Sequence, residues 1–579
     1  MAQLIEYTEP LWRDLNMREL GVDEAYINAR SYYNKTTLMY MLSDECHTCP
    51  FSKMKTLPPI DDPSKKVVDM QIFKVNVAHA FKIKLMDTDV GRYAFENQTS
   101  LCKIYPTNMH EFGVYNFTVN ANGECELITD KQGVNINLSI LSVIILVGFL
   151  LTLIKIVLWA WRTVGYDDVI VLASATGQMD DTVPTPNKKR MRSLDTFRGL
   201  AIVLMIFVNS GGGAYWWIEH ATWNGLHLAD IVFPSFLWIM GVCIPISLKS
   251  QLSRKTPRLK ICGNIFWRSF KLFVIGLCLN SVNGENLGNL RFMGVLQRFG
   301  VAYLVCGVVH TIFSQKDLTM PQEVWKCLIF ELILLKAELV LMLCLIGIYF
   351  GITFGLPVPG CPKGYLGPGG KHGFLAYPNC IGGAAGYIDM QILGNAHTYQ
   401  YPTANHVYDS TAFDPEGLFG CLLTIVQVLF GVLAGMIILV RNVWSSRIKR
   451  WLFWGLLLLL LGGLLCLFSI EDGFIPINKN LWSLSFVFVT AGLAFLVLSL
   501  LYFVIDVRNF WSGFPFEESG KNAIIMYVGH SVLNRILPWH WSIGAMNTHF
   551  VLLLESVWNT LMWIAIAIYL DAKSFYYSL

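Results

Sequence analysis

The sequence predicts an α-helical polytopic membrane protein with about 11 transmembrane helices and an N-terminal β-rich lumenal domain. Of its 579 residues, 54% are hydrophobic and only 15% are charged. This is too little polar surface to cover a water-soluble globule of the same size. The hydrophobic residues also occur in long blocks, and a helix needs about 20 of them to cross a bilayer. A water-soluble globular enzyme is therefore excluded.

Eleven stretches are apolar and long enough to be candidate spans, and the second of them is the least typical. They lie at 138–161, 196–211, 228–248, 264–282, 294–313, 327–354, 418–440, 451–470, 482–504, 521–539 and 549–570.

Lys and Arg gather in the connections after the first, third and seventh spans. Short cytoplasmic loops collect these residues, so we predict that these three connections are cytosolic. The opposite, lumenal side then receives the N-terminal region and the long loop 355–417. The predicted organisation is a lumenal domain 1–135, a first transmembrane helix 136–162, a basic cytosolic linker 163–194 and a membrane domain 195–579.

Short β-branched and aromatic runs such as VVDMQIFKVNV alternate with polar turns in the N-terminal region, which indicates strands. The same region contains four sequons, at Asn34, Asn97, Asn116 and Asn137. Sequons are glycosylated only in secretory compartments, so they agree with a lumenal position and predict a glycoprotein.

Cysteines also indicate an oxidising compartment. Cys46, Cys49, Cys102 and Cys125 form an even set, and Cys361 and Cys380 flank a Gly/Pro-rich part of the long loop. We expect disulfides at these six positions. The Cys46-His-Thr-Cys49 spacing also suits zinc, but without a second such pair we expect no metal.

Polar residues within apolar spans are costly and are candidates for function. Asn209 ends the second span, Asp230 begins the third and His530 interrupts the tenth, while His220 follows three consecutive glycines. Irregular backbone at membrane depth is tolerated where it lines a cavity, so His220 is a candidate base beside a cavity. Structural interpretations stay open: Asn209 and Asp230 as helix caps, and His530 bonded to a carbonyl.

Several long motifs resemble the heparan-α-glucosaminide N-acetyltransferase family, lysosomal membrane enzymes that move acetyl from cytosolic acetyl-CoA to terminal glucosamine. The resemblance spans 190–540 and rests on these runs: RSLDTFRGLAIVLMIFVNSGGGAYWW, EHATWNGLHLADIVFPSFLWIMG, GVLQRFGVAY, LPVPGCPKGYLGPGG, YPNCIGGAAGYID, FDPEGLFG, EDGFIPINKNLWSLS and NAIIMYVGH.

The resemblance implies that His220 is the catalytic histidine, with Asn209, Asp230 and His530 at the other catalytic positions. It implies acetyl-CoA as co-substrate, and as acceptor the terminal glucosamine of heparan sulfate. It also implies a multi-pass protein of the lysosomal membrane, which we expect to contact the lipid bilayer and no nucleic acid, and which could form a homodimer.

Both substrates need binding groups. Guanidinium groups pair well with phosphates, so Arg192, Arg198 and Arg298 are candidates for CoA at a cytosolic mouth. Arg192 can equally be a membrane anchor, and Asp195 is a possible partner of Arg298. The candidates for the sugar are Asn478, Lys479 and Asn480 before Trp482, together with Asp389 and Glu416, although the PINKNLW segment also reads as a turn.

In the favoured mechanism, His220 is the general base for direct transfer, Asn209 polarises the thioester carbonyl, and Asp230 or His530 orients the imidazole. The alternative is an acetyl-His220 intermediate. Two other classes stay open: a proton-coupled solute transporter and a glycosylated scaffold. The lack of visible repeated halves weighs against the transporter.

Overall fold

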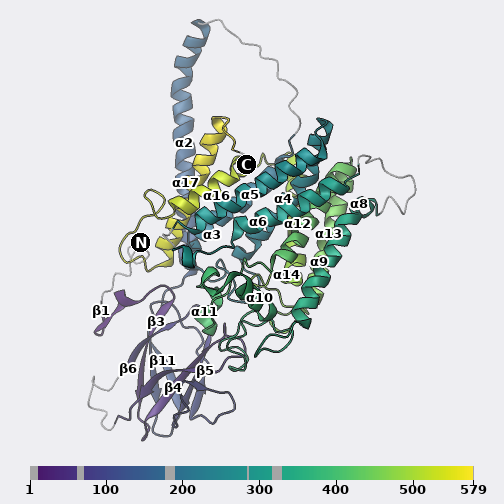
Figure 1. The fold of residues 1–579 in the computed structure, drawn as a ribbon. Coiled ribbons are helices and arrows are strands. Elements are labelled where there is room, and N and C mark those ends of the chain that lie inside the picture. Colours follow the sequence, from purple (N-terminus) through teal and green to yellow (C-terminus); the bar gives the residue numbers. More distant parts are fainter. Residues whose placement is uncertain (1–10, 61–70, 176–189, 283–285, 316–328, 578–579) are drawn as a thin grey trace.

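The computed structural model describes residues 11–60, 71–175, 190–282, 286–315 and 329–577. Figure 1 shows a β domain, the strands of the N-terminal region, at one end of a bundle of helices. Positions 176–189 of the predicted linker 163–194 lie outside the described residues.

The β domain contains a two-stranded sheet, β1-β2, and two larger sheets that pack face to face. One has the order β11-β10-β3-β6 and the other β8-β5-β4-β7-β9, and β10 runs parallel to β3. Alternate side chains such as Ile27, Phe117 and Leu85 fill the space between them. The strands are β1 Leu11–Trp12, β2 Leu15–Asn16, β3 Glu24–Ser31, β4 Thr37–Ser43, β5 Phe51–Leu57, β6 Gln71–Asn76, β7 Phe81–Met86, β8 Tyr93–Ala94, β9 Cys102–Ile104, β10 Val114–Val119 and β11 Cys125–Lys131.

The rest of the described chain is mainly helical. Its helices are α2 Asn137–Ala175, α3 Arg192–Asn209, α4 Leu228–Ser253, α5 Arg258–Asn280, α6 Val295–Phe313, α8 Phe330–Leu334, α9 Lys336–Gly355, α10 Gly383–Leu393, α11 Thr403–Tyr408, α12 Cys421–Val440, α13 Trp444–Leu465, α14 Leu484–Leu501, α15 Phe516–Lys521, α16 Ala523–Leu533 and α17 His549–Ala572. Helix α2 continues past the predicted end of the first span at residue 162.

Nine helices in the described part of the chain are long and apolar enough to cross a membrane. The prediction was about eleven, and the two remaining stretches form helices that do not meet this requirement. Helix α3 begins with Arg192, Asp195 and Arg198. Helix α16 has only 11 residues, because Asn522 separates it from α15. The polytopic fold with a β-rich N-terminal region is as predicted.

Helices α4 and α12 form the centre of the bundle. A Cβ atom added to Gly431 would lie 2.0 Å from the Trp238 carbonyl oxygen, and one added to Gly241 would lie 2.1 Å from that of Val428. The two backbones therefore touch, as small residues allow in membrane helix pairs. This contact holds the middle of α4, roughly two to three helical turns after Asp230.

The structure pairs all six predicted cysteines, as Cys46–Cys49, Cys102–Cys125 and Cys361–Cys380. Asn34, Asn97 and Asn137 of the sequons are exposed. Asn116 differs, because it is half-buried on β10 and its amide oxygen accepts a hydrogen bond from Asn28 at 3.1 Å. No cluster of three His, Cys, Asp or Glu side chains suited to a metal occurs among the described residues.

Candidate active site

The candidate site is built on the connection between α3 and α4. Gly211, Gly212 and Gly213 all have positive φ, so α3 ends there and the chain turns. Larger residues do not fit, since a Cβ at Gly212 would lie 2.5 Å from Ile218 and one at Gly213 would lie 2.9 Å from Leu553. The turn brings His220 back against the first turn of α4.

His220 and Asp230 form a hydrogen-bonded pair. His220 Nδ1 lies 2.7 Å from Asp230 Oδ1. The second carboxylate oxygen accepts from the backbone N–H of His227 at 3.0 Å and from that of Ala221 at 3.1 Å. Asp230 therefore caps α4 and orients the imidazole at the same time. A carboxylate that accepts the Nδ1 proton leaves the lone pair on Nε2, which is the form a base requires.

Lys479 is the second charged neighbour of His220. Its Nζ lies 3.0 Å from Nδ1 and 3.2 Å from Nε2 of His220, and 3.9 Å from Asp230. Burial lowers the pKa of His220, and the charge of Lys479 lowers it further against the effect of Asp230. The lowered pKa favours the neutral imidazole, which is the form that can accept a proton.

Asn209 and His530 form a second pair. The Asn209 amide nitrogen lies 3.0 Å from His530 Nε2, and His530 Nδ1 lies 3.0 Å from the Met526 carbonyl oxygen. Since a carbonyl only accepts, the His530 proton is on Nδ1 and Nε2 accepts from Asn209. Among the described residues the Asn209 amide has no second hydrogen-bond partner, so its other N–H can donate to a ligand. His530 thus orients Asn209 instead of His220.

A cavity of about 650 Å³ lies between the β domain and the helices, and we call it the interface cavity. His220 is one of its lining residues, and 38% of the His220 side chain is exposed. The β domain contributes Asp23, Glu45 and His79 to its wall, and Trp216 belongs to the connection that carries His220.

A second cavity, of about 280 Å³, lies between the helices and is called here the helix cavity. One face of α4 from Phe236 to Gln251 lines it, which corresponds to roughly 22 Å along the helix axis. Met205 and Tyr527 also line it, and they precede Asn209 and His530 by one helical turn. The Tyr527 and His530 ring centroids lie 5.6 Å apart. The helix cavity thus ends beside the Asn209–His530 pair.

The predicted CoA arginines fall into two groups. Arg198 lines the helix cavity and pairs with Asp195 at 3.3 Å. Arg192 lies at the same end of the bundle as Arg198, but its guanidinium is paired with Glu517 at 2.9 Å.

Arg298 lies at the other end, so its position differs from the predicted cytosolic mouth. It is 1% exposed, donates to the Gly417 carbonyl oxygen at 2.8 Å and stacks over Trp482 at 5.0 Å. The reason is that α6 begins at the end of the bundle that carries the β domain. Asp195 is not its partner, because that carboxylate binds Arg190 and Arg198.

Of the amino acids predicted to bind the sugar, Lys479 is the one that contacts His220. Asn478 is fully buried and holds a turn, since its oxygen accepts from the Leu481 N–H at 2.8 Å. Asp389 accepts from the Phe419 N–H at 3.0 Å, and Glu416 pairs with Arg291 at 2.6 Å. Although burial opposes it, the charges of Arg291 and Lys479 lower the pKa of Glu416 to about 2. Asn480 is half-buried.

The prediction from sequence missed Glu45, Asp23 and Trp216, which share the interface cavity with His220. It also missed Tyr527 and Lys521, which line the helix cavity. Tyr527 stands three residues before His530 in the YVGH motif, so helical spacing was a usable signal for it. No comparable signal existed for Glu45, which lies 177 positions before its contact Thr222.

Fold and site together define an integral membrane enzyme, in which a His–Asp pair and an Asn–His pair lie beside two cavities. The family model "Heparan-alpha-glucosaminide N-acetyltransferase, catalytic" matches residues 190–356. The human protein named heparan-alpha-glucosaminide N-acetyltransferase is 36% identical, over 98% of this chain and 90% of its own length. The mouse protein of that name is 34% identical, over 97% and 89%. The chain belongs to this family of acyltransferases.

Proposed function

We propose that the protein transfers acetyl from acetyl-CoA to the amine of a terminal glucosamine of heparan sulfate across the lysosomal membrane. The observation that carries this proposal is the pair of cavities. One contains the imidazole of His220, and the other ends beside Asn209 and His530. A donor and an acceptor in different compartments require such an arrangement.

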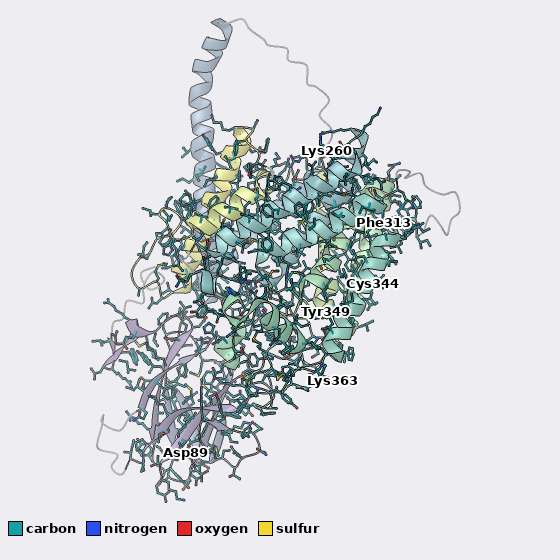
Figure 2. The ribbon with its side chains drawn as sticks, viewed as in Figure 1. Asp89, Lys260, Phe313, Cys344, Tyr349 and Lys363 are labelled. Atoms are coloured by element: carbon teal, nitrogen blue, oxygen red, sulfur yellow. A yellow bond between two sulfur atoms is a disulfide. The ribbon has the colours of Figure 1, made fainter. Side chains whose placement is uncertain are left out.

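The end of the bundle that carries the β domain is assigned to the lumen, and the opposite end to the cytosol. Figure 2 shows Lys260 at the end of the bundle far from Asp89 of the β domain. The basic connection 249–260 belongs to that far end, in agreement with the positive-inside rule.

The helix cavity suits acetyl-CoA as a substrate. Three cations line it, Arg198, Arg268 and Lys521, of which Arg198 is paired with Asp195 and Lys521 with Glu517 and Asp571. Apolar residues of α4 line its length, and the cations suit phosphates. A thin pantetheine arm fits along this cavity and brings the thioester towards Asn209. The free N–H of Asn209 then donates to the thioester carbonyl oxygen as negative charge develops there.

His220 is the general base in this proposal. Its Nε2 accepts a proton from the glucosamine nitrogen as that nitrogen bonds to the acetyl carbon. The C–S bond breaks, and the thiolate of CoA takes the proton from the His220 imidazolium, so that CoA leaves as the free thiol and the neutral imidazole is restored. Asp230 stabilises the imidazolium that forms, and Lys479 has to move from Nε2 when the amine arrives.

Met205 and Tyr527 of the helix cavity precede Asn209 and His530 by one helical turn, which supports a donor path that ends near this pair. We favour direct transfer, in which the thioester meets the amine without a carrier. An acetyl-His220 intermediate is the alternative, because the same Nε2 is a possible nucleophile.

The test is acetyl transfer by the purified protein from radiolabelled acetyl-CoA to glucosamine. His220→Ala is expected to lower kcat by roughly 10²-fold to 10⁴-fold. In the same assay, rapid quenching without acceptor is expected to leave the wild-type protein unlabelled. Turnover retained in the variant would refute the role of His220, and stoichiometric label on His220 would replace direct transfer by the covalent route.

A further inference from the structure

We propose that the β domain supplies part of the acceptor site, and that Glu45 recognises the ammonium form of the amino sugar. This inference rests on the proposed function and adds a specificity-determining residue to it. The interface cavity is the starting observation, since both the β domain and the helices line it. An acceptor that reaches His220 through this cavity must contact both walls.

Glu45 lies close to His220 in this cavity. One carboxylate oxygen accepts a hydrogen bond from the hydroxyl of Thr222, two residues after His220. The other oxygen lies 3.6 Å from His79 Nε2. The Glu45 side chain is 27% exposed, so the carboxylate is anchored at one oxygen and accessible to a ligand at the other.

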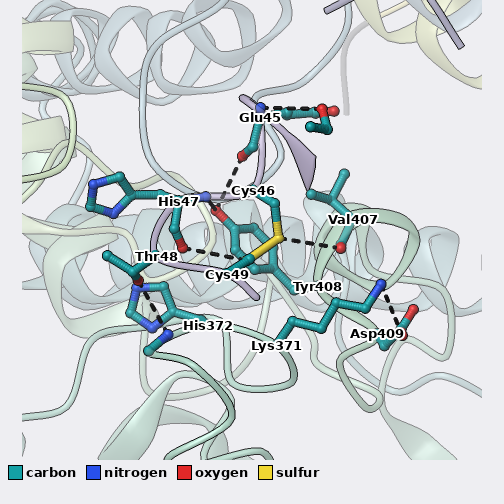
Figure 3. The surroundings of a disulfide bond; sticks show 12 residues. Glu45, Cys46, His47, Thr48, Cys49, Lys371, His372, Val407, Tyr408 and Asp409 are labelled. Carbon is teal, nitrogen blue, oxygen red and sulfur yellow. Dashed lines mark hydrogen bonds and ion pairs between the residues drawn. A yellow bond between two sulfur atoms is a disulfide. The ribbon is translucent and has the colours of Figure 1, made fainter. Parts of the chain in front are cut away.

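The Cys46–Cys49 disulfide loop positions Glu45, as Figure 3 shows. The Tyr408 hydroxyl donates to the Glu45 carbonyl oxygen at 3.3 Å and accepts from the His47 N–H at 3.3 Å. The backbone N–H of Phe374 donates to the Thr48 carbonyl oxygen at 2.9 Å. The loop is therefore fixed to the helical part of the protein, and with it the backbone of Glu45.

The charge of the interface cavity suits a cation. Glu45 and Glu219 line it, and so does Asp23, which is paired with His549 at 3.1 Å. Its lining lysine, Lys371, is paired with Asp409 at 3.0 Å. Its lining histidines are His79, His220, His227 and His406, so Glu45 and Glu219 supply the negative charge that is left for a ligand. An amino sugar in an acidic lumen is protonated, so these carboxylates favour its binding. The bound ammonium then loses one proton to solvent in the cavity, and the neutral amine that results attacks the thioester. The acetylated product is neutral, and its loss of this attraction promotes its release.

Trp216 supplies a surface for the sugar ring. It lines the same cavity and is 41% exposed. Its ring centroid lies 5.0 Å from that of His79 and 5.5 Å from that of His227, which hold the indole in place. An aromatic surface beside carboxylates is suitable for a pyranose that carries an ammonium group.

The test is Glu45→Gln, which keeps the shape of the side chain and removes its charge. We expect the KM for glucosamine to rise roughly 10-fold or more, since a hydrogen bond to a charged group is lost. The KM for acetyl-CoA and the unfolding temperature should not change. Glu124→Gln is the matched control, because Glu124 is exposed in the same domain and does not line the cavity.

Calorimetry without acetyl-CoA tests the recognition separately from catalysis, with D-glucosamine and N-acetylglucosamine as probes. The wild-type protein should bind the amine more tightly than the amide, and Glu45→Gln should lose that preference. An unchanged preference and a KM within twofold of wild type would overturn the role of Glu45 while transfer continues. Absence of transfer in the wild-type protein would instead overturn the proposed function, and the calorimetry would still test Glu45.

Discussion

At the scale of single residues, the two charged neighbours of His220 act on it in opposite directions. Asp230 stabilises the protonated ring, while burial and the charge of Lys479 favour the neutral ring. The net effect is a lowered pKa. A base with a lowered pKa stays active to a lower pH, which suits the acidic lumen proposed for this side of the membrane.

Lys479→Met is expected to raise the pKa of His220, because it removes the repulsion between two cations. Activity depends on the neutral ring, so the acidic limb of the kcat/KM profile should move to higher pH by about one unit or less. Lys479→Arg keeps the charge and should leave that limb near its wild-type position. An identical acidic limb in the Met and Arg variants would contradict the assignment of Lys479.

At the scale of elements, the β domain is joined to the site through the start of α17. His549 is buried, and its Nδ1 lies 2.8 Å from the Gly213 carbonyl oxygen in the glycine turn. Its Nε2 lies 3.1 Å from Asp23 and 3.9 Å from Glu111. One imidazole therefore connects the β domain to the turn that places His220.

Glu111 makes this junction sensitive to pH. Burial raises the pKa of Glu111 to about 7 despite the opposing charge of His549. Between its unfolded value near 4.5 and about 7, the folded state holds a proton that the unfolded state has lost. The contribution of Glu111 to the free energy of unfolding is therefore fully present at acidic pH. It decreases by roughly 1–3 kcal/mol as the pH rises towards 7.

Hydrogen exchange of the backbone around 21–26 and 210–215, corrected for intrinsic rates, measures this effect. Protection in the wild-type protein should decrease from pH 5 to pH 7.5, and Glu111→Gln should remove most of that dependence. Glu126→Gln, on the exposed face of the same domain, should behave as wild type. The proposal for Glu111 fails if its variant keeps the wild-type slope.

At the scale of the whole molecule, the sequence predicts whatever depends on local pattern. Apolar runs predict the membrane helices, and the ten-residue separation of His220 and Asp230 is short enough for a direct contact between them. Asn209 and His530 are 321 positions apart, and only the family resemblance links them. Arg298 was assigned by residue type, although the predicted topology already places the start of its span on the lumenal side.

Local sequence patterns do not predict the contacts between the β domain and the helices. Glu45 has no periodicity or motif that connects it to Thr222, since the contact depends on how two separately folded parts dock. The same docking creates the interface cavity. The site residues of the β domain can therefore be identified from the structure but not from the sequence alone.

The two cavities are lined by different residues, so each should control one substrate. Arg198→Ala is expected to raise the KM for acetyl-CoA roughly 10-fold, because it removes a cation that lines the helix cavity. Asp195 keeps Arg190 as a partner, which limits the structural cost. The KM for glucosamine should stay unchanged, the reverse of the result for Glu45→Gln.

Arg254→Ala is the control for this experiment, because Arg254 is exposed beyond the same end of α4 and does not line the helix cavity. It should leave both KM values near those of the wild-type protein. If Arg198→Ala raised the KM of both substrates equally, the cavities would not be separate entrances. If the donor enters through the helix cavity, the KM for acetyl-CoA and the KM for glucosamine must change independently. The reason is that the thioester and the amine meet only where the donor path ends, near Asn209 and His220.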